Sequence, residues 1–384
     1  MDVYPVGDAF SYTDIATEEA PVADDGITRE LHGAVVEFEA SGRWPRDAVA
    51  CRKVAAALLV QAREELLSDL GIEAEVGEDF LDVRYPEVAF RVRVFHPHEL
   101  GDVAQRVTSF QAPAGGSASP SAADLARLRD LWWRPRIRNA LHSHALRQPA
   151  LAGAARLCKR WMASQMLSGY DEFVEHLVAH VFLHPAPFDS PTSPQAGFCR
   201  FCSLLDAHDW QHEPLMLDFD GRFSEEERMS LRRSFERSRS ESERTTYFWV
   251  SSRFDPHAML LPTPPATVCA WLQQRARHAL GFFGRKLIGE APAGSKGWQP
   301  MFALDTGVFD VVLRLRPRGR PEGGDSRRGG LARRRARTEG QALRSLVEKV
   351  RANLSPVCLV FYDAEGWWPS SGARARFSHS TRTC

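Results

Sequence analysis

The chain has 384 residues, of which 43% are hydrophobic and 26% charged. This composition is typical of a folded globular protein and excludes a disordered or fibrous one. Its 49 basic and 49 acidic residues balance, so any nucleic-acid contact must be local and not a wrapping of the whole surface. The apolar runs are far shorter than the roughly 20 residues that span a bilayer, and we expect no membrane partner.

Length and cysteine usage narrow the class further. A chain of 384 residues predicts two or three domains of roughly 100 to 200 residues each, and we expect three. Seven cysteines without an apolar leader at the amino end indicate a reducing compartment, the cytosol or nucleus, with free thiols.

The first predicted domain covers residues 1–115 and mixes strands with one helix. The first thirty residues show no period, and the pattern begins with a run rich in β-branched and aromatic residues. The expected elements are a strand at 33–40, a helix at 47–70 that ends at Gly71, and strands at 80–85 and 88–95. Small, Pro-bearing residues at 111–121 predict a linker.

The second predicted domain covers residues 122–294 and is mostly helical. Apolar residues recur there at helical spacing in four segments, 151–167, 171–183, 197–207 and 267–287. Ser193 and Pro194 suit the N-cap and first turn of the third of these helices.

The third predicted domain covers residues 298–384 and is a small α/β unit. Its expected elements are a strand at 309–317, a helix at 341–353 and a strand at 357–363. The tail from Trp367 onward does not resemble a closing strand, and we do not expect one there.

A basic insert at 318–344 interrupts this last domain. It carries nine arginines against three acidic residues, with glycine pairs at 323 and 329, which predicts a disordered tract. Flexible arginines bind phosphates without reading sequence, so Arg333, Arg334 and Arg335 are candidates for RNA contact or for a nuclear localisation signal. A solvated loop insertion without a ligand is an equally good interpretation.

Four acidic residues are candidate ligands of a catalytic metal site. Nucleotide transfer needs two or three carboxylates around Mg²⁺, and the candidates are Glu37, Glu39, Asp79 and Asp82. Acidic residues at alternate strand positions are more often a solvated face than a metal site, and no Gly-Ser loop precedes these. We therefore predict no catalytic residue, no metal and no cofactor.

A possible zinc pattern also has a simpler explanation. Cys199 and Cys202 precede His208 and His212, but only five residues separate the two pairs, whereas finger sites use about twelve. The cysteines lie in an apolar helical segment and are interpreted as buried packing residues.

Three histidines, His176, His180 and His184, recur on one predicted helix face. A zinc protease motif would need a glutamate directly after the first, where Leu177 stands. Surface or half-buried histidines are the expected result. A phosphate-binding loop of the form GxxxxGK is absent from the sequence as well.

Residues 156–219 resemble the Nrap family of nucleolar RNA-associated proteins. The resemblance is carried in order by the segments 158–161, 182–188 and 193–201, followed by Asp209 and Trp210. It extends to residues 41–47 and 90–94, and to 309–317 and 359–363 near the end. Members of the family are longer at the amino end, so the resemblance also implies a carboxy-terminal portion.

The resemblance implies an α+β fold with three parts. These are a degenerate nucleotidyltransferase-like domain, a helical poly(A) polymerase/oligoadenylate synthetase-like domain and a small C-terminal α/β domain. In active relatives a third carboxylate lies on the strand that corresponds to 88–95, where Arg91 or a neighbour replaces it here. Since arginine cannot bind Mg²⁺, the resemblance implies lost catalysis, and phosphate contact by Arg91 and Arg93 becomes plausible.

The expected function is a non-catalytic scaffold and RNA-associated subunit of the small-subunit processome. Such a protein acts in pre-rRNA processing and ribosome biogenesis in the nucleolus, within the nucleus. Its expected partners are pre-rRNA, snoRNA and other processome proteins, without a small-molecule substrate. The alternatives are an active RNA nucleotidyltransferase and a purely protein-binding module.

Overall fold

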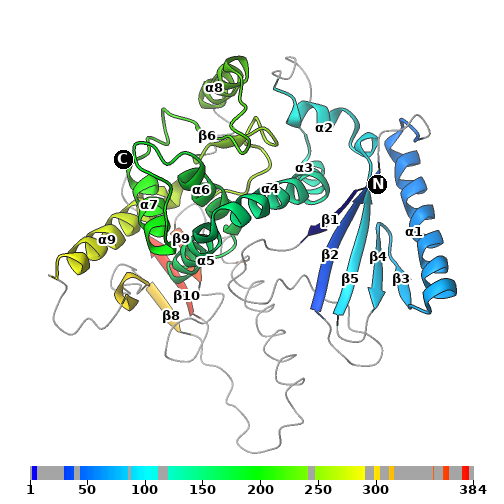
Figure 1. Cartoon of the computed structure of the whole chain (residues 1–384), viewed down its shortest axis with the longest axis horizontal. Helices are drawn as coiled ribbons and strands as arrows, with labels where there is room; N and C mark the ends of the chain where they lie inside the picture. Colours follow the sequence, from blue (N-terminus) through cyan, green and yellow to red (C-terminus); the bar gives the residue numbers. More distant parts are fainter. Residues whose placement is uncertain are drawn as a thin grey trace, which may run out of the picture.

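The computed structural model describes residues 2–6, 30–38, 44–84, 88–110, 120–240, 247–289, 298–302, 311–314, 349, 358–362 and 374–379. Figure 1 shows a five-stranded sheet with one long helix along it, a group of helices beyond, and a smaller sheet near the carboxyl end. No helix among the described residues is both long and apolar enough to cross a membrane.

The five-stranded sheet has the order β1-β2-β5-β4-β3. Its strands are β1 (Asp2–Val6), β2 (Glu30–Glu37), β3 (Ala74–Val76), β4 (Phe80–Arg84) and β5 (Val88–Phe95). The β2 and β5 strands run parallel, and the other pairs are antiparallel. The expected strands at 80–85 and 88–95 are confirmed, and β2 begins three residues before its predicted start.

The expectation that the pattern starts only at residue 33 was wrong, because β1 lies before it. This strand has five residues and pairs antiparallel with β2 from Asp2 opposite Glu37 to Val6 opposite Gly33. It lies at the edge of the sheet and contains Pro5, which an edge strand tolerates. Five residues with a proline give too few alternations to mark a strand in the sequence.

Helix α1 (Ala48–Leu70) covers one face of this sheet (Figure 1). It begins at its N-cap Asp47, whose side chain accepts from the amide of Ala50, and it ends at Gly71 with a φ of 65°. Both ends were predicted, because a short acidic cap and a glycine in the left-handed region are strong helix boundaries. Leu59 packs from α1 into a small core with Val94 and other sheet residues.

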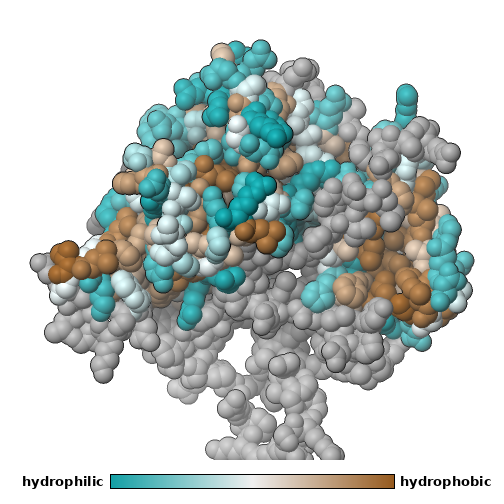
Figure 2. All heavy atoms as spheres, in the orientation of Figure 1, coloured by the Kyte–Doolittle hydropathy of each residue, from teal (hydrophilic) through white to brown (hydrophobic). Residues whose placement is uncertain are grey.

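The other side of α1 keeps apolar side chains in contact with solvent. Val49, Leu67 and Leu70 are each more than half exposed. In Figure 2 hydrophobic surface appears at the right of the molecule, where α1 lies in Figure 1.

The helical part follows the sheet and includes a short two-stranded parallel sheet, β6 (Leu215–Leu217) with β7 (Val250–Ser252). Its helices are α2 (Gly101–Thr108), α3 (Ala122–Leu128), α4 (Arg134–Arg147), α5 (Pro149–Ser164), α6 (Asp171–Leu183), α7 (Pro194–Ala207), α8 (Glu225–Ser240) and α9 (Cys269–Leu287). Short turns lie at η1 (Pro97–Glu99), η2 (Arg129–Trp133, π-helical), η3 (Ala266–Val268) and η4 (Gln299–Phe302).

The four helices predicted in this part are confirmed with shifts of a few residues at most. The expected bounds of α6 agree at both ends, and Ser193 caps α7 by accepting from the amide of Ala196, with Pro194 in the first turn. Helices α2, α3, α4 and α8 were not among those predicted, and along the 16 residues of α8 only Leu231 and Phe235 are buried. A charged helix with so narrow an apolar stripe gives little periodic signal.

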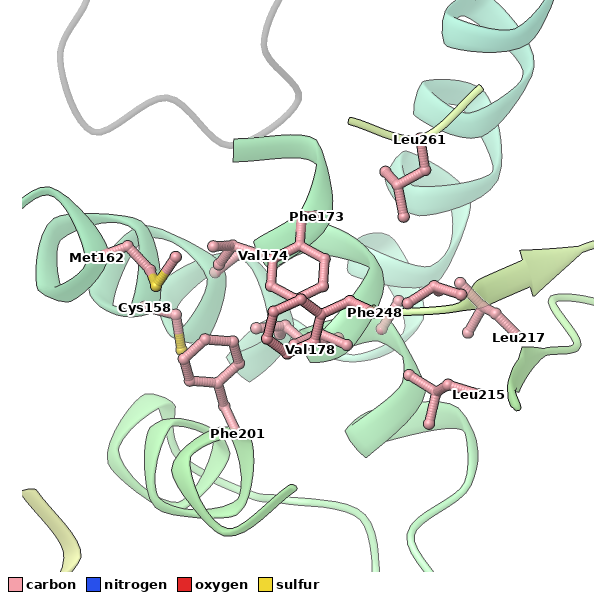
Figure 3. Packing of buried hydrophobic residues seen from close by; sticks show 14 of the residues in the cluster. Cys158, Met162, Phe173, Val174, Val178, Phe201, Leu215, Leu217, Phe248 and Leu261 are labelled. Atoms are coloured by element: carbon pink, nitrogen blue, oxygen red, sulfur yellow. The ribbon is translucent and has the colours of Figure 1, made fainter. Parts of the chain in front are cut away.

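The main core lies where α5, α6 and α7 meet the short strand β6. Figure 3 shows Cys158 and Met162 from α5 close to Val174 of α6 and Phe201 of α7. Phe173 packs edge to face against Phe248 at 5.1 Å between ring centroids. Fully burying one such aromatic or aliphatic side chain stabilises the fold by about 1.5 to 3 kcal/mol.

The carboxyl end carries a three-stranded antiparallel sheet of order β8-β10-β9. Its strands are β8 (Val311–Arg314), β9 (Cys358–Tyr362) and β10 (Arg374–His379). The strands expected at 309–317 and 357–363 are confirmed, but the expectation of no strand after Trp367 was wrong, because β10 is the central strand. The expected helix at 341–353 lies outside the described residues, except for the helical Lys349.

Candidate functional site

The sheet face that points away from α1 gathers four of the charged residues singled out above. Side chains of paired residues point to the same side of a sheet. Asp82 is paired with Arg91, while Arg93 lies opposite Val35, two residues before Glu37 on the same strand. The alternate residues, such as Val94, pack under α1. Strand periodicity therefore brings Glu37, Asp82, Arg91 and Arg93 onto one face.

Asp82 is held by the arginine beside it. Both of its carboxylate oxygens accept hydrogen bonds from Arg91, from Nε and Nη2, each at 2.8 Å. The Asp82 side chain is 3% exposed, and the Arg91 guanidinium also lies 4.0 Å from the ring centroid of Phe80. Two parallel hydrogen bonds of this kind fix both groups strongly.

Glu37 is held by an arginine of the helical part. Arg136 of α4 donates from Nη2 to both oxygens of Glu37, at 2.7 and 2.8 Å. The same guanidinium lies 4.5 Å from the ring centroid of Trp132 and donates to its carbonyl oxygen at 3.0 Å. This contact joins the carboxyl end of β2 to α4.

A third arginine binds two further acidic residues. Arg127 of α3 donates to Asp79 at 2.9 Å and, from Nε, to Glu99 at 2.6 Å. Burial raises the pKa of Glu99, although the neighbouring Arg127 opposes that shift. Arg127 therefore connects the turn before β4 and the segment after β5 to the helical part.

The buried Asp82 and the half-buried Glu37 on this face are too far apart to share a metal ion. Asp82 and Glu37 lie on strands separated by β5, and their levels on β5 differ by four residues, from Arg91 to Phe95. Spacings of about 4.8 Å between strands and about 3.3 Å per residue put their Cα atoms about 16 Å apart. Oxygens that bind one Mg²⁺ lie about 2.1 Å from it. Glu39, the fourth acidic candidate, lies outside the described residues.

The four Cys and His residues of the apparent zinc pattern do not gather around one point in the described structure. Cys202 is buried in the core and Cys199 packs against it, as predicted, and burial raises the pKa of the Cys199 thiol to about 12. His208 packs edge to face against Trp210, whereas the exposed His212 bonds to Asp209. Packing, not metal binding, explains the Cys pair.

The three histidines of α6 differ in exposure. The expectation of surface or half-buried side chains was wrong for His176, which is 2% exposed and stacks on Trp133 with 5.3 Å between ring centroids. His180 and His184 are half-buried, as expected. Burial lowers the pKa of His176 to about 4 and, with His184 nearby, that of His180 to about 3. The error arose because α6 is buried almost all round.

Sequence reasoning missed a buried ion pair between α5 and α6. Lys159 Nζ lies 2.7 Å from Glu175 Oε1, with side-chain exposures of 0% and 2%. A cavity of about 210 Å³ lies next to it and is lined by Arg134, Arg138, Gly169, Tyr170, Asp171, Glu172, Glu175 and Pro262. Lys159 follows Ala155 by four residues on a buried helix face, and this position was the only sign of it in the sequence.

The five-stranded sheet and the helical part that follows it coincide with the two domains of a nucleotidyltransferase-like protein, as two family models show. The Nrap protein nucleotidyltransferase domain 4 matches residues 1–146, and the Nrap protein PAP/OAS1-like domain 5 matches residues 148–298. The chain belongs to the Nrap family.

Relatives in several vertebrates are similar to the greater part of the chain. Nucleolar protein 6 of Homo sapiens is 31% identical over 334 residues, which cover 83% of this chain and 28% of that protein. Nucleolar protein 6 of Mus musculus is 31% identical over 299 residues, 75% of this chain and 25% of that protein. The chain thus spans about a quarter of the length of these relatives. A solved E. coli MS115-1 CdnC:HORMA-deltaN complex is 10% identical with a TM-score of 0.42, over 78% of this chain and 79% of that one.

Proposed function

We propose that the chain is a non-catalytic scaffold and RNA-associated part of the small-subunit processome, which acts in pre-rRNA processing and ribosome biogenesis. Membership of the Nrap family and similarity to proteins named Nucleolar protein 6 support this proposal. The same similarity supports a location in the nucleolus, and hence the nucleus. The proposed partners are pre-rRNA, snoRNA and other processome proteins.

The pairing of each acidic candidate that the structure describes with an arginine supports the absence of catalysis. Asp82 is bound by Arg91 and Glu37 by Arg136. A carboxylate whose oxygens already face a guanidinium would have to give up that partner before it could bind Mg²⁺. Nucleotide transfer depends on such metal ions to neutralise phosphate charge in the transition state.

An incorporation assay tests this part of the proposal. The purified chain is incubated with labelled nucleoside triphosphates, Mg²⁺ and RNA, alongside an active poly(A) polymerase as positive control. We expect no incorporation above background. Incorporation that the substitution Asp82→Asn abolishes would instead establish an active RNA nucleotidyltransferase.

The proposed RNA contacts are Arg91, Arg93 and the run Arg333 to Arg335. Arg91 and Arg93 lie on the charged face of the sheet, where Asp82 competes with phosphate for Arg91. The run 333–335 lies outside the described residues. Purification of the tagged chain from nucleolar extract, followed by sequencing of bound RNA, tests this part. Recovery of no RNA above a mock purification would favour a purely protein-binding module.

A further inference from the structure

The first turn of α1 and the segment after β5 bring three possible metal ligands together. Cys51 lies in the first turn of α1, and His96 and His98 follow the last residue of β5. One ligand atom from each residue lies within 4.8 Å of the others. Among the residues that the structure describes, this is the place where three or more such groups gather so closely.

The surroundings hold these side chains in place. Cys51 and His96 are buried and His98 is half-buried. The ring of Trp44 stacks on His96 with 4.3 Å between centroids and 10° between planes. His98 packs edge to face against His96 at 4.7 Å. The three groups therefore lie close together, and zinc binding at His96 Nδ1 would replace the hydrogen bond that this atom accepts from the amide of His98 at 3.2 Å.

Hydrogen bonds around the cluster orient its rings. His98 Nδ1 lies 3.0 Å from the carbonyl oxygen of Pro45, and Nδ1–H donates to it, which leaves Nε2 as the ligand atom. Such a bond from the second ring nitrogen to a carbonyl typically orients a metal-binding histidine. The Cys51 thiol donates to the same carbonyl at 2.9 Å, and loss of its proton would leave a thiolate near the amino end of α1, which favours negative charge.

We propose that Cys51, His96 and His98 bind a zinc ion, with a water molecule in the fourth position. A thiolate and two imidazoles are ligands that Zn²⁺ prefers. Tetrahedral zinc binds its ligand atoms at about 2.0 to 2.3 Å. The three ligand atoms lie within 4.8 Å of one another, so they must move closer together to bind one ion. This site is independent of the proposed RNA-associated function and of the charged sheet face.

The site has a structural consequence if zinc is bound. It would join the first turn of α1 to the segment after β5, in addition to the hydrogen bonds to Pro45. Zinc binds the folded chain and so stabilises it by mass action. Because a cysteine binds zinc as its thiolate, binding releases a proton and strengthens as pH rises.

Metal analysis of the full chain tests the proposal. The wild-type chain, purified with added zinc and then dialysed, is measured by mass spectrometry, and cobalt is substituted to record thiolate-to-cobalt charge transfer. We expect one zinc per chain and an intense near-ultraviolet cobalt band. Cys51→Ser should lose both, because serine is a poor zinc ligand. Its hydroxyl can still donate to the Pro45 carbonyl oxygen, so the variant removes the ligand and keeps the hydrogen bond. Cys199→Ser, half-buried in α7, should keep both.

Thermal unfolding provides the second measurement and guards against misfolded variants. Zinc should raise the melting temperature of the wild type and of Cys199→Ser, and should leave that of Cys51→Ser unchanged. His98→Asn serves if Cys51→Ser fails to fold, because its amide can still donate to Pro45 while Nε2 is lost. A folded wild-type chain without zinc and without a zinc-dependent melting shift overturns the proposal, as does equal zinc in all variants.

Discussion

At the scale of single residues, buried charges are the most demanding features of this chain. Lys159 and Glu175 are almost fully buried and lie 2.7 Å apart. Removing ions from water costs several kcal/mol each, and their attraction offsets that cost only while both are present. The pair is therefore far more sensitive to the loss of one partner than to the loss of both.

Replacement of Lys159 by methionine should destabilise the chain by about 3 to 5 kcal/mol, since it leaves the Glu175 carboxylate buried without its cation. The double variant Lys159→Met with Glu175→Leu should recover most of that loss. Urea unfolding followed by circular dichroism measures both. A single variant as stable as the wild type would show that the two charges do not interact in the folded chain.

Stability should fall as pH decreases from about 6.5 to 4. Burial lowers the pKa of His176 to about 4 and that of His180 to about 3, so in this window the unfolded chain binds protons that the folded chain does not. Asp255 and Glu99 act in the opposite sense, because burial raises their pKa values, that of Asp255 to about 6. Burial also lowers the pKa values of His184, His208 and His257, so five groups stand against two.

Unfolding free energies measured between pH 7 and 4 test this expectation. The variant His176→Phe keeps an aromatic ring against Trp133 and should show a shallower decline. If the unfolding free energy depended equally on pH in the variant and the wild type, His176 would have the same pKa in the folded and the unfolded chain.

At the scale of elements, strong local patterns were predictable and weak ones were not. The bounds of α1 follow from the Asp47 cap and from Gly71, and β5 follows from its alternation. The edge strand β1 and the central strand β10 were missed, because their stability depends on partners distant in the sequence. Tertiary pairing of this kind overrides local propensity.

The close approach of α5 and α6 to α7 leaves no room for a side chain at Gly197. A Cβ atom at Gly197 would lie 2.7 Å from Ala154 Cβ and 2.9 Å from the ring of Phe182. Gly197→Ala should therefore destabilise the chain by about 1 to 3 kcal/mol through overpacking. Gly284→Ala in α9 is the control, since nothing lies within 4 Å of its Cβ position, and it should stabilise by about 0.5 to 1 kcal/mol. Thermal unfolding distinguishes the two, and equal effects would contradict this packing.

At the scale of the whole molecule, arginines of the helical part hold the charged end of the sheet. Arg127 and Arg136 come from α3 and α4 and bind Glu99 and Glu37 across the junction. The sequence identified the acidic candidates, but not these partners, because Arg136 and Glu37 are 99 residues apart in the chain. The domain bounds 1–115, 122–294 and 298–384 stay predictions.

RNA affinity should depend on salt through the basic insert. Replacement of Arg333, Arg334 and Arg335 by serine should reduce the slope of log affinity against log salt by about 2, since each lost phosphate contact removes about 0.7 for single strands. Fluorescence anisotropy with labelled single-stranded RNA at several salt concentrations measures the slope. An unchanged slope would remove these residues from the proposed interface.

The central claim is that the carboxylates of the sheet face do not gather around a divalent ion, and a Mn²⁺ titration followed by electron paramagnetic resonance tests it most directly. Manganese prefers the oxygen ligands of magnesium sites and is visible when free in solution. We expect the wild-type chain and the double variant Glu37→Gln with Asp82→Asn to bind Mn²⁺ equally weakly. A tight site in the wild type that this double variant abolishes would contradict the account.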